Sequence, residues 1–337
     1  MIYLKNDYSM GAHPQVMDAL VKTNLENTDG YGSDHHCDEA KALIRRLTGS
    51  SDMHVHFLMG GTQTNLAAIA SFLRPHQAVI SADTGHICVH EVGAVEATGH
   101  KVIHIPTDDG KLRPEHIEET LEIHEDFHWV QPKLIYISNL TETGIFYTKK
   151  ELTNLRKTCD KHGLYIYMDG ARLPMALTLP DNDLTMKDLP RFCDAFYIGG
   201  TKCGLLFGEA LCIVNDDLKE DTDYLMKQRG GVMAKGRLLG VQFKAVFEDN
   251  LYFALGENCN RLAAKLAEGI GDKGYEFDCP PCSNLVFPVF PNKLIEELEK
   301  KVMFEFWRKF NDGTSAIRLV TSWGTKEDEI EDFLSLI

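Results

Sequence analysis

The sequence predicts an α/β protein with a mostly parallel sheet in a large domain and a small α+β domain at the C-terminal end. Two short apolar runs, residues 164–168 and 195–198, each end on charged or glycine-rich segments. Runs of this length between turn residues are typical of strands that are buried on both faces of a parallel sheet. Helical patterns alternate with such runs through the first two thirds of the chain, whereas the tail mixes strands and helices differently.

The first half of the chain supplies most elements of the predicted sheet. Pro14 opens a helical spacing of apolar residues over 14–25, because proline suits the first helical position. A polar, glycine-rich loop precedes an amphipathic helix over 39–47, which Gly49 ends. Further helices are expected at residues 66–73, 89–98, 114–124 and 149–162, and strands at residues 54–58, 78–81, 101–105 and 134–138.

The second half completes the large domain and adds the small one. A strand at 210–214 is expected to be the last of the large domain, and helices are expected at 233–247 and 258–269. The tail is expected to hold strands at residues 276–277, 285–290, 303–310 and 315–321 and a helix at 294–301. Since 337 residues exceed what one core usually holds, three parts are expected. They are an N-terminal arm and helix that pack with the small domain (1–25), the large domain (26–245) and the small domain (246–337).

Composition excludes several classes of function. The net charge is −15 and no block of basic residues occurs, which argues against nucleic-acid binding. No apolar run has the length of a membrane span and the start lacks a signal-peptide pattern, so no membrane partner is expected. Nine scattered cysteines indicate reduced thiols in a cytoplasmic protein. The pair Cys279 and Cys282 has no second pair nearby, so a loop is favoured over a redox or metal site.

Asp169 and Lys202 are the main candidates for chemistry. Each follows one of the two buried runs, and in open α/β sheets ligands bind beyond the carboxyl ends of the strands. A carboxylate and an amine placed side by side there suggest pyridoxal phosphate (PLP), because lysine forms a Schiff base with its aldehyde and aspartate pairs with its pyridine nitrogen. On spacing alone, two surface residues at loop ends explain the pattern equally well.

A glycine-rich turn, residues 60–65, offers a site for the phosphate. It lies between a predicted strand and a predicted helix, where free backbone N–H groups and the helix dipole favour an anion. Thr62 and Thr64 add hydroxyl donors. The turn lacks the lysine of a nucleotide-binding loop and the spacing of a dinucleotide fingerprint. An ordinary glycine turn with a threonine cap is the alternative.

Two further residues are ambiguous when taken singly. His86 also follows a strand, so its imidazole is placed to stack on a flat ring or to act as a base, although a capping or solvent-facing histidine is the commoner case. Arg318 lies within an apolar strand pattern, where a buried guanidinium needs an anionic partner. An arginine on the solvated face of that strand is the simpler interpretation.

Eight motifs taken together resemble one family. They are L-K-N-D-Y, Y-G-S-D, G-G-T-Q-T-N, G-H-I-C-V-H-E-V-G, M-D-G-A-R-L, G-G-T-K, Q-R-G-G-V-M-A-K-G and I-R-L-V-T-S-W, in that order along nearly the whole chain. Their order and spacing are similar to those of the threonine aldolase and β-eliminating lyase family of fold-type I PLP-dependent enzymes. The resemblance implies a transferase-like fold with a seven-stranded sheet, an amino acid substrate, and homodimers or homotetramers with shared active sites.

The resemblance also implies roles for individual residues. Lys202 would hold PLP covalently, Asp169 would pair with the pyridine nitrogen, and His86 would stack on the ring and help to move a proton. Phosphate binding would fall to Gly61, Thr62 and Thr201. The substrate carboxylate would be held by Arg172 and Arg318, since a guanidinium fork suits a carboxylate.

Several positions depart from the family pattern. Asn6 stands where relatives often carry serine near the substrate, and Tyr31 matches a tyrosine that reaches a neighbouring subunit's site. His35 and His36 follow it where Gly-Asp-Asp-Pro is common, which leaves the preference for the β-substituent open. The family's phosphate-binding arginine is absent. Lys235 or Arg229 from another subunit is the expected replacement.

The expected function is a PLP-dependent lyase that cleaves the Cα–Cβ bond of β-hydroxy amino acids, converting threonine or allo-threonine to glycine and acetaldehyde. The bond that stands perpendicular to the cofactor ring breaks, and the two arginines would fix that rotation. β-Elimination from another amino acid, started by Lys202 at the Cα–H bond, is the main alternative. A non-catalytic protein that binds PLP or another phosphorylated ligand, and a cofactor-free structural protein, are further options.

Overall fold

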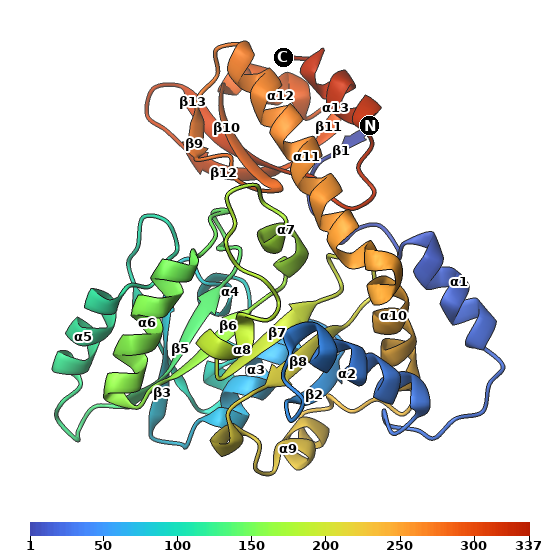
Figure 1. The fold of residues 1–337 in the computed structure, drawn as a ribbon. Helices are drawn as coiled ribbons and strands as arrows, with labels where there is room; N and C mark the ends of the chain where they lie inside the picture. Colours follow the sequence, from blue (N-terminus) through green and yellow to red (C-terminus); the bar gives the residue numbers. More distant parts are fainter.

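The computed structural model describes all residues, 1–337, and consists of a large unit and a smaller one joined by a long helix (Figure 1). The large unit contains a seven-stranded sheet in the order β2-β8-β7-β6-β5-β3-β4. Its strands are β2 (His54–Leu58), β3 (Gln77–Ala82), β4 (Lys101–Ile105), β5 (Gln131–Ser138), β6 (Tyr165–Asp169), β7 (Ala195–Gly199) and β8 (Glu209–Ile213). All neighbours are parallel except where β8 pairs with β7 and with β2. The predicted α/β class with a mostly parallel sheet is confirmed.

Both faces of this sheet are covered by helices, and each covered face has its own apolar core (Figure 1). Along β5, Ile135 and Ile137 belong to one core and Leu134 and Tyr136 to the other, as the two-residue period of a strand requires. The helices up to β8 are α1 (Pro14–Thr23), α2 (His35–Thr48), α3 (Gly61–Phe72), α4 (His86–Val89), α5 (Pro114–Ile123), α6 (Lys149–His162), α7 (Leu173–Leu177) and α8 (Leu189–Phe192). Those after it are α9 (Thr222–Gln228), α10 (Arg237–Phe247), α11 (Leu251–Asp272), α12 (Asn292–Leu298) and α13 (Glu327–Leu334).

The direction of β8 decides what lies at the functional edge of the sheet. Strands β2, β3, β5, β6 and β7 all end at one edge, because β2 and β7 are both antiparallel to β8. In the register, Glu209 lies opposite Leu58 on one side and Gly199 on the other. The first residue of β8 therefore joins the last residues of its neighbours at this edge.

Most of the predicted helices differ in their bounds in the structure, with α10 beginning at Arg237 and α11 at Leu251, and three of the differences bear on the functional edge. Helix α2 begins at His35 rather than at residue 39, because the Asp34 side chain accepts the backbone N–H of Cys37 at 3.0 Å and caps it. Helix α3 includes Gly61, so the predicted phosphate turn is itself the first helical turn. The predicted helix over 89–98 is wrong. Val92 and Gly93 have φ values of 54° and 71°, which no α-helix accommodates, and only a 3₁₀ turn follows.

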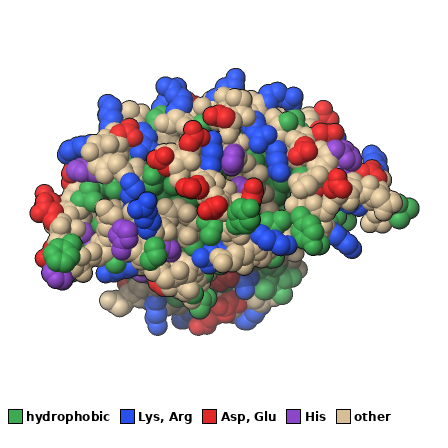
Figure 2. All heavy atoms as spheres, turned by 90° about the horizontal axis from the view of Figure 1, so that it is seen from below, with side chains coloured by type: hydrophobic (Ala, Val, Ile, Leu, Met, Phe, Trp, Pro, Cys, Tyr) green, Lys and Arg blue, Asp and Glu red, His purple; other side chains and the backbone are tan.

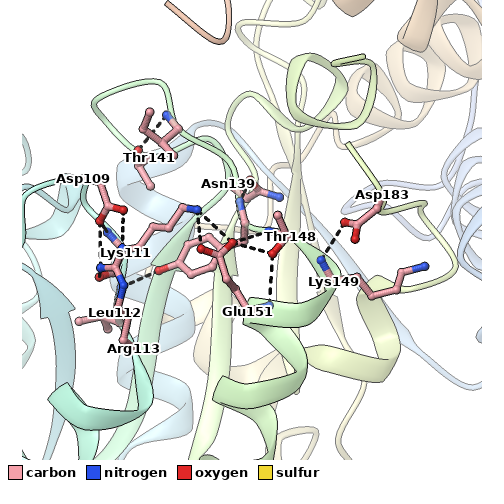
Figure 3. Close-up of polar contacts among 12 residues, drawn as sticks. Asp109, Lys111, Leu112, Arg113, Asn139, Thr141, Thr148, Lys149, Glu151 and Asp183 are labelled. Atoms are coloured by element: carbon pink, nitrogen blue, oxygen red, sulfur yellow. Dashed lines mark hydrogen bonds and ion pairs between the residues drawn. The ribbon is translucent and has the colours of Figure 1, made fainter. Parts of the chain in front are cut away.

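The start of α6 is held by a polar network that also fixes the preceding loop (Figure 3). Thr148 and Glu151 form a capping box, in which the Thr148 N–H donates to Glu151 Oε2 at 2.7 Å. Lys111 Nζ donates to Glu151 Oε1 at 2.8 Å. Asn139 Oδ1 accepts the backbone N–H of Tyr147 at 3.2 Å. The chain between β5 and α6 is therefore held against the edge where β5 ends.

The smaller unit contains a four-stranded antiparallel sheet in the order β12-β13-β10-β9, together with α11, α12 and α13. Its strands are β9 (Phe277–Cys279), β10 (Leu285–Pro291), β12 (Glu305–Lys309) and β13 (Thr314–Val320). Strand β1 (Ile2–Tyr3) pairs with β11 (Val302–Met303), whereas α1 lies against α10. Helix α13 was not predicted, because its five acidic residues and short length hide the apolar pair Ile330 and Phe333.

Helix α11 connects the two units (Figure 1). Near its start, the Tyr252 hydroxyl donates to the carbonyl oxygen of Gly199 at 2.9 Å, at the end of β7. Farther along, Leu262, Leu266 and Ile270 belong to the core of the smaller unit. One helix therefore contacts both the edge of the large sheet and the smaller core.

The cysteines, the helices and one face of the surface can be described briefly. All nine cysteines are free thiols, and Cys279 and Cys282 lie at the end of β9 and in the loop after it. None of the helices combines the length and the apolar character that a membrane span requires. On the face seen from below, acidic and basic side chains are interspersed (Figure 2). That face lacks the single-sign area that nucleic-acid binding uses.

Candidate active site

A cavity of about 400 Å³ lies at the edge where the parallel strands end. Loops that follow β2, β3, β5, β6 and β7 contribute to its wall, and so does β13 of the smaller unit. Eight residues singled out from the sequence line it: Gly61, Thr62, His86, Asp169, Arg172, Thr201, Lys202 and Arg318. The structure therefore brings together side chains that are spread over more than 250 positions of the chain.

Asp169, the last residue of β6, is buried and held by several donors. The Tyr136 hydroxyl donates to Oδ2 at 2.6 Å, the Asn65 amide to Oδ2 at 3.2 Å and the Ala171 N–H to Oδ1 at 3.0 Å. Burial by itself raises the pKa of this carboxyl, but the neighbouring His86 and the donated hydrogen bonds outweigh burial and hold the pKa below its usual range. Asp169 is therefore a carboxylate at neutral pH.

His86, the first residue of α4, is oriented by a buried carboxylate. Its Nδ1 lies 2.7 Å from Glu91 Oε1, and the same oxygen accepts the Asn65 amide at 2.8 Å. Burial lowers the pKa of His86, and Glu91, Glu142 and Asp169 more than offset it, so the pKa is raised overall. With Nδ1 bound to Glu91, Nε2 is the nitrogen left for a ligand.

Lys202 lies in the tight turn that follows β7. A Cβ on Gly200 would collide with the carbonyl oxygen of Gly208, and a Cβ on Gly170 would collide with that of Tyr197. Glycine is required at both positions because the backbones of the two strand ends approach each other closely. The Lys202 and Asp169 side chains consequently line one cavity, as the sequence predicted.

The glycine-rich turn supplies the second end of the cavity. Gly61 and Thr62 are the first residues of α3, and backbone N–H groups at the start of a helix have no acceptor within the helix. Thr201 lines the same cavity from the β7 loop, with its hydroxyl oxygen accepting the Gly208 N–H at 3.0 Å. Backbone donors, a helix N-terminus and two hydroxyl groups form a suitable anion site.

The two candidate arginines differ in their partners. Arg172 forms a bidentate ion pair with Asp7, with Nε to Oδ2 at 2.7 Å and Nη2 to Oδ1 at 3.1 Å, and both side chains are buried. Burial opposes ionisation of both groups, yet mutual attraction raises the pKa of Arg172 and lowers that of Asp7. Asn284 also donates to Asp7, at 3.2 Å. Much of the Arg172 fork is therefore engaged within the chain.

Arg318 has no acidic partner within ion-pairing distance, and its buried Nε atom has no hydrogen-bond acceptor. It projects from β13 of the smaller unit into the cavity wall. Burial is the largest of the effects that lower its pKa, and repulsion from Arg172 adds to it. An unpaired guanidinium at this place needs an anion, and the substrate carboxylate that was predicted for it has the right chemistry.

Four predicted site residues lie outside this cavity: Asn6, Tyr31, Arg229 and Lys235. Asn6 closes a turn of the arm, where its Oδ1 accepts from Tyr8 N at 3.1 Å and from Ser9 Oγ at 2.8 Å. Tyr31 lines a separate cavity of about 600 Å³ between α2 and α9, with Lys227 Nζ 4.1 Å above its ring.

The two histidines whose role the sequence left open lie on the first turn of α2. The rings of His35 and His36 are 4.0 Å apart, and His36 Nε2 lies 2.7 Å from Glu26 Oε2. They are not part of the cavity that Lys202 lines.

Some cavity residues were missed in the sequence. They include Tyr8, Met59, His90, Glu142, Tyr197 and Glu209. Each stands near a predicted motif, and Glu142 and Glu209 follow or begin predicted strands. A charged residue next to the end of a buried strand could therefore have identified both Glu142 and Glu209 as candidates. Nothing local marks Asp7 as the partner of Arg172, because 165 positions separate them.

The fold places the chain in a broad class. It superimposes on an aspartate aminotransferase from Thermus thermophilus with a TM-score of 0.72, over 100% of this chain and 90% of the other, at 15% identity. That likeness concerns the fold, which is the fold-type I architecture of PLP-dependent enzymes, as the sequence predicted.

Residues 4–289 match the family described as beta-eliminating lyase, and the chain belongs to this family. It is 30% identical to a low specificity L-threonine aldolase of Pseudomonas aeruginosa, over 98% of this chain and 95% of that protein. A second low specificity L-threonine aldolase, from another Pseudomonas strain, is 31% identical over the same shares. The solved structure of a Leishmania major threonine aldolase matches with a TM-score of 0.98 and 48% identity, over 100% of this chain and 98% of that one.

The fold and family imply PLP dependence, and the residues of the cavity fit the group. Asp169 remains charged when buried, as a partner of a protonated pyridine nitrogen must. Lys202 lines the same cavity as Asp169, and the first turn of α3 offers backbone N–H donors to a phosphate. The Nε atom of Arg318 has no acceptor within the protein, so it can donate to an anionic group of a ligand.

Proposed function

We propose that this chain is a PLP-dependent lyase that cleaves the Cα–Cβ bond of β-hydroxy amino acids, converting threonine or allo-threonine to glycine and acetaldehyde. The observation that carries the proposal is the shared cavity of Lys202, the charged Asp169 and the unpaired Arg318. A protein that only binds a phosphorylated ligand needs no free guanidinium facing its lysine. The threonine aldolases to which the chain is similar support the choice of substrate.

Substrate binding is assigned to Arg318, with Arg172 beside it. The Arg318 fork binds the α-carboxylate of the amino acid, and the Asp7–Arg172 pair forms the fixed wall next to it. Because the carboxylate is held at one end, rotation about the bond from nitrogen to Cα is restricted. This restriction selects which Cα bond is aligned for cleavage.

The bound cofactor supplies an electron sink for the pair of electrons that the broken Cα bond leaves behind. Lys202 would provide the amine that holds the cofactor. Asp169, whose own pKa is low, would favour a proton on the pyridine nitrogen. Gly61, Thr62 and Thr201 would bind the phosphate.

His86 is proposed as the base that removes the proton from the β-hydroxyl group. Glu91 binds Nδ1 and thereby fixes the ring, which leaves Nε2 to accept the proton. The carboxylate also raises the pKa of His86, which makes the imidazole a stronger base. The same ring would stack on the bound cofactor.

β-Elimination is a second candidate, and the description of the matching family favours it. In that reaction Lys202 removes the Cα proton and a group leaves from Cβ. The products separate the two reactions: aldol cleavage yields glycine and an aldehyde, whereas elimination yields ammonia and a 2-oxo acid. Titration with threonine, allo-threonine, serine and aromatic β-hydroxy amino acids then defines the substrate.

We further infer that the chain acts in the cytoplasm as a homodimer or homotetramer whose subunits share active sites. The exposed Tyr31 and the basic residues Arg229 and Lys235 lie away from their own cavity, which supports roles for them in a neighbouring subunit's site. Asn6 is proposed to act indirectly, through the turn that presents Tyr8 to the cavity.

The deciding experiment is the visible spectrum of the purified protein, with Lys202→Ala as the comparison. We expect the wild-type protein to show the yellow absorbance of lysine-bound PLP and to release acetaldehyde from threonine. The variant should lose both. Turnover of β-hydroxy amino acids by purified Lys202→Ala would show that the assignment is wrong.

A further inference from the structure

Glu209 is a buried carboxyl group that the proposed reaction does not use. It is the first residue of β8, and the antiparallel direction of that strand brings it to the edge where its neighbours end. It lines the cavity of Lys202 and is almost fully buried, yet no lysine, arginine or histidine lies within ion-pairing distance of it. Leaving a carboxyl group in such a place is costly unless it has a specific partner.

The hydrogen bonds of Glu209 converge on the turn that carries Lys202. Its Oε2 accepts the backbone N–H of Gly200 at 2.8 Å. The Thr201 hydroxyl group also favours the charged form of Glu209, and the Thr201 oxygen accepts the Gly208 N–H at 3.0 Å. Gly200 and Thr201 are the two residues that precede Lys202 in the chain. The carboxyl group therefore fixes the backbone from which the lysine side chain projects.

Burial raises the pKa of Glu209 to about 7, although hydrogen bonds from Thr201 and Gly200 and the charge of Lys202 oppose the rise. The carboxyl group consequently changes charge near neutral pH. The titratable groups that interact with it come from four parts of the fold, and they are Tyr167 and Asp169 on β6, Tyr197 on β7, Lys202 and Cys203 in the loop after β7, and Tyr252 on α11. Lys202 is the one cation among them.

We propose that Glu209 is a positioning residue for Lys202, which fixes the Gly200–Thr201 turn and provides the negative charge that keeps a proton on the lysine nitrogen. The inference rests on the proposed function, since it concerns the lysine that holds PLP. It extends that function to a residue outside the family motifs described above. A nearby carboxylate favours the charged form of an amine, so its removal makes the nitrogen lose its proton at lower pH.

The test is the pH dependence of the visible absorbance of PLP bound to Lys202, which reports the protonation of the nitrogen without turnover. In Glu209→Gln the side chain keeps its shape and loses its charge. We expect the titration midpoint to fall by about one pH unit, because removal of a nearby opposite charge typically shifts a pKa by an amount of this order.

Matched variants separate charge from shape. Asp188→Asn removes a buried carboxylate far from the cavity and should leave the midpoint unchanged. Should Glu209→Gln fail to fold, Glu209→Ala tests the same point, because it also removes the charge and should lower the midpoint in the same direction. Glu209→Asp keeps a carboxylate at this position and should leave the midpoint nearer to the wild-type value.

A midpoint that is unchanged in folded, PLP-bound Glu209→Gln, or in Glu209→Ala where the first variant does not fold, would overturn the inference while leaving the proposed function intact. A wild-type protein that binds no PLP at Lys202 would overturn both.

Discussion

Arg172 and Arg318 line the same cavity, and both were assigned to the substrate carboxylate from sequence, yet the structure gives them different surroundings. Arg172 is bound in a bidentate pair by Asp7, whereas Arg318 has no acid at all. The pKa of Arg172 is raised and that of Arg318 is lowered. The one arginine has its counter-charge within the chain and the other lacks one.

The difference teaches that a residue type and its burial do not define a role; the partner does. A paired guanidinium stabilises the folded chain and shapes the wall of the cavity. An unpaired one retains its capacity to bind an anion. Removing Arg172 should therefore act mainly on stability, and removing Arg318 mainly on substrate binding. The following predictions test this division, from the largest expected effect to the smallest.

Arg172→Met should have the largest effect, because it leaves the buried Asp7 carboxylate without its counter-charge. We expect a loss of roughly 3–5 kcal/mol in the free energy of unfolding, as is typical when one partner of a buried pair is removed. Urea denaturation measures the loss. The double variant Asp7→Leu with Arg172→Met removes both charges and should recover most of the stability. A double variant no more stable than Arg172→Met would contradict the pairing.

Arg318→Ala should reduce kcat/KM for threonine by about 10²- to 10³-fold, mainly through KM, since truncating a charged partner of a buried anion costs about 2–5 kcal/mol. The midpoint of thermal unfolding and the PLP absorbance should stay near the wild-type values. Steady-state kinetics with a parallel melting curve makes the measurement. Arg318→Lys keeps the charge without the fork and should give an intermediate loss. An unchanged KM would remove Arg318 from the carboxylate site.

The acid side of the stability profile should report on the Asp7–Arg172 pair. The pKa of Asp7 is lowered in the folded chain, so its contribution is complete above the unfolded value of about 3.9 and is lost as pH falls through the lower folded value. Asp7→Asn should therefore reduce stability at pH 7 and flatten the loss below about pH 4. Stability measured by urea between pH 2.5 and 7 tests this. A parallel, unflattened acid profile in the variant would speak against the pair.

Arg261→Ala should have the smallest effect. Arg261 forms an exposed pair with Glu327 at 3.2 Å, and pairs of this kind contribute about 0–1 kcal/mol. We expect no measurable change in KM and almost none in stability. The variant serves as the baseline for arginine removal. A loss of several kcal/mol in the free energy of unfolding would mean that burial does not decide how much an arginine pair stabilises this chain.

The sheet could be predicted from sequence because its strands are short apolar runs between turns. The predicted strands at 54–58 and 101–105 match β2 and β4 at both ends. The helix predicted at 89–98 does not form, because the backbone of Val92 is left-handed. The apolar spacing of the segment gives no sign of that conformation.

The part of the candidate site that could be predicted from sequence consists of residues at or shortly after the end of a strand. Asp169, Lys202, His86 and Gly61 were found in that way, and all four line the cavity. Pairings between distant segments could not be predicted. The Asp7–Arg172 pair and the approach of Glu209 to the Lys202 turn depend on sheet order and strand direction, which a linear pattern does not specify.

The reactivity of the nine free thiols can be used to follow unfolding of the chain. Seven are buried, and burial raises the pKa of Cys37 and Cys159 to about 12. An alkylating reagent at neutral pH should therefore modify the exposed Cys282 first and Cys88 more slowly. The mass gained by each molecule then counts how many thiols have become accessible, so a sample that has opened only its smaller unit, where Cys279 lies, is distinguishable from one that has opened throughout.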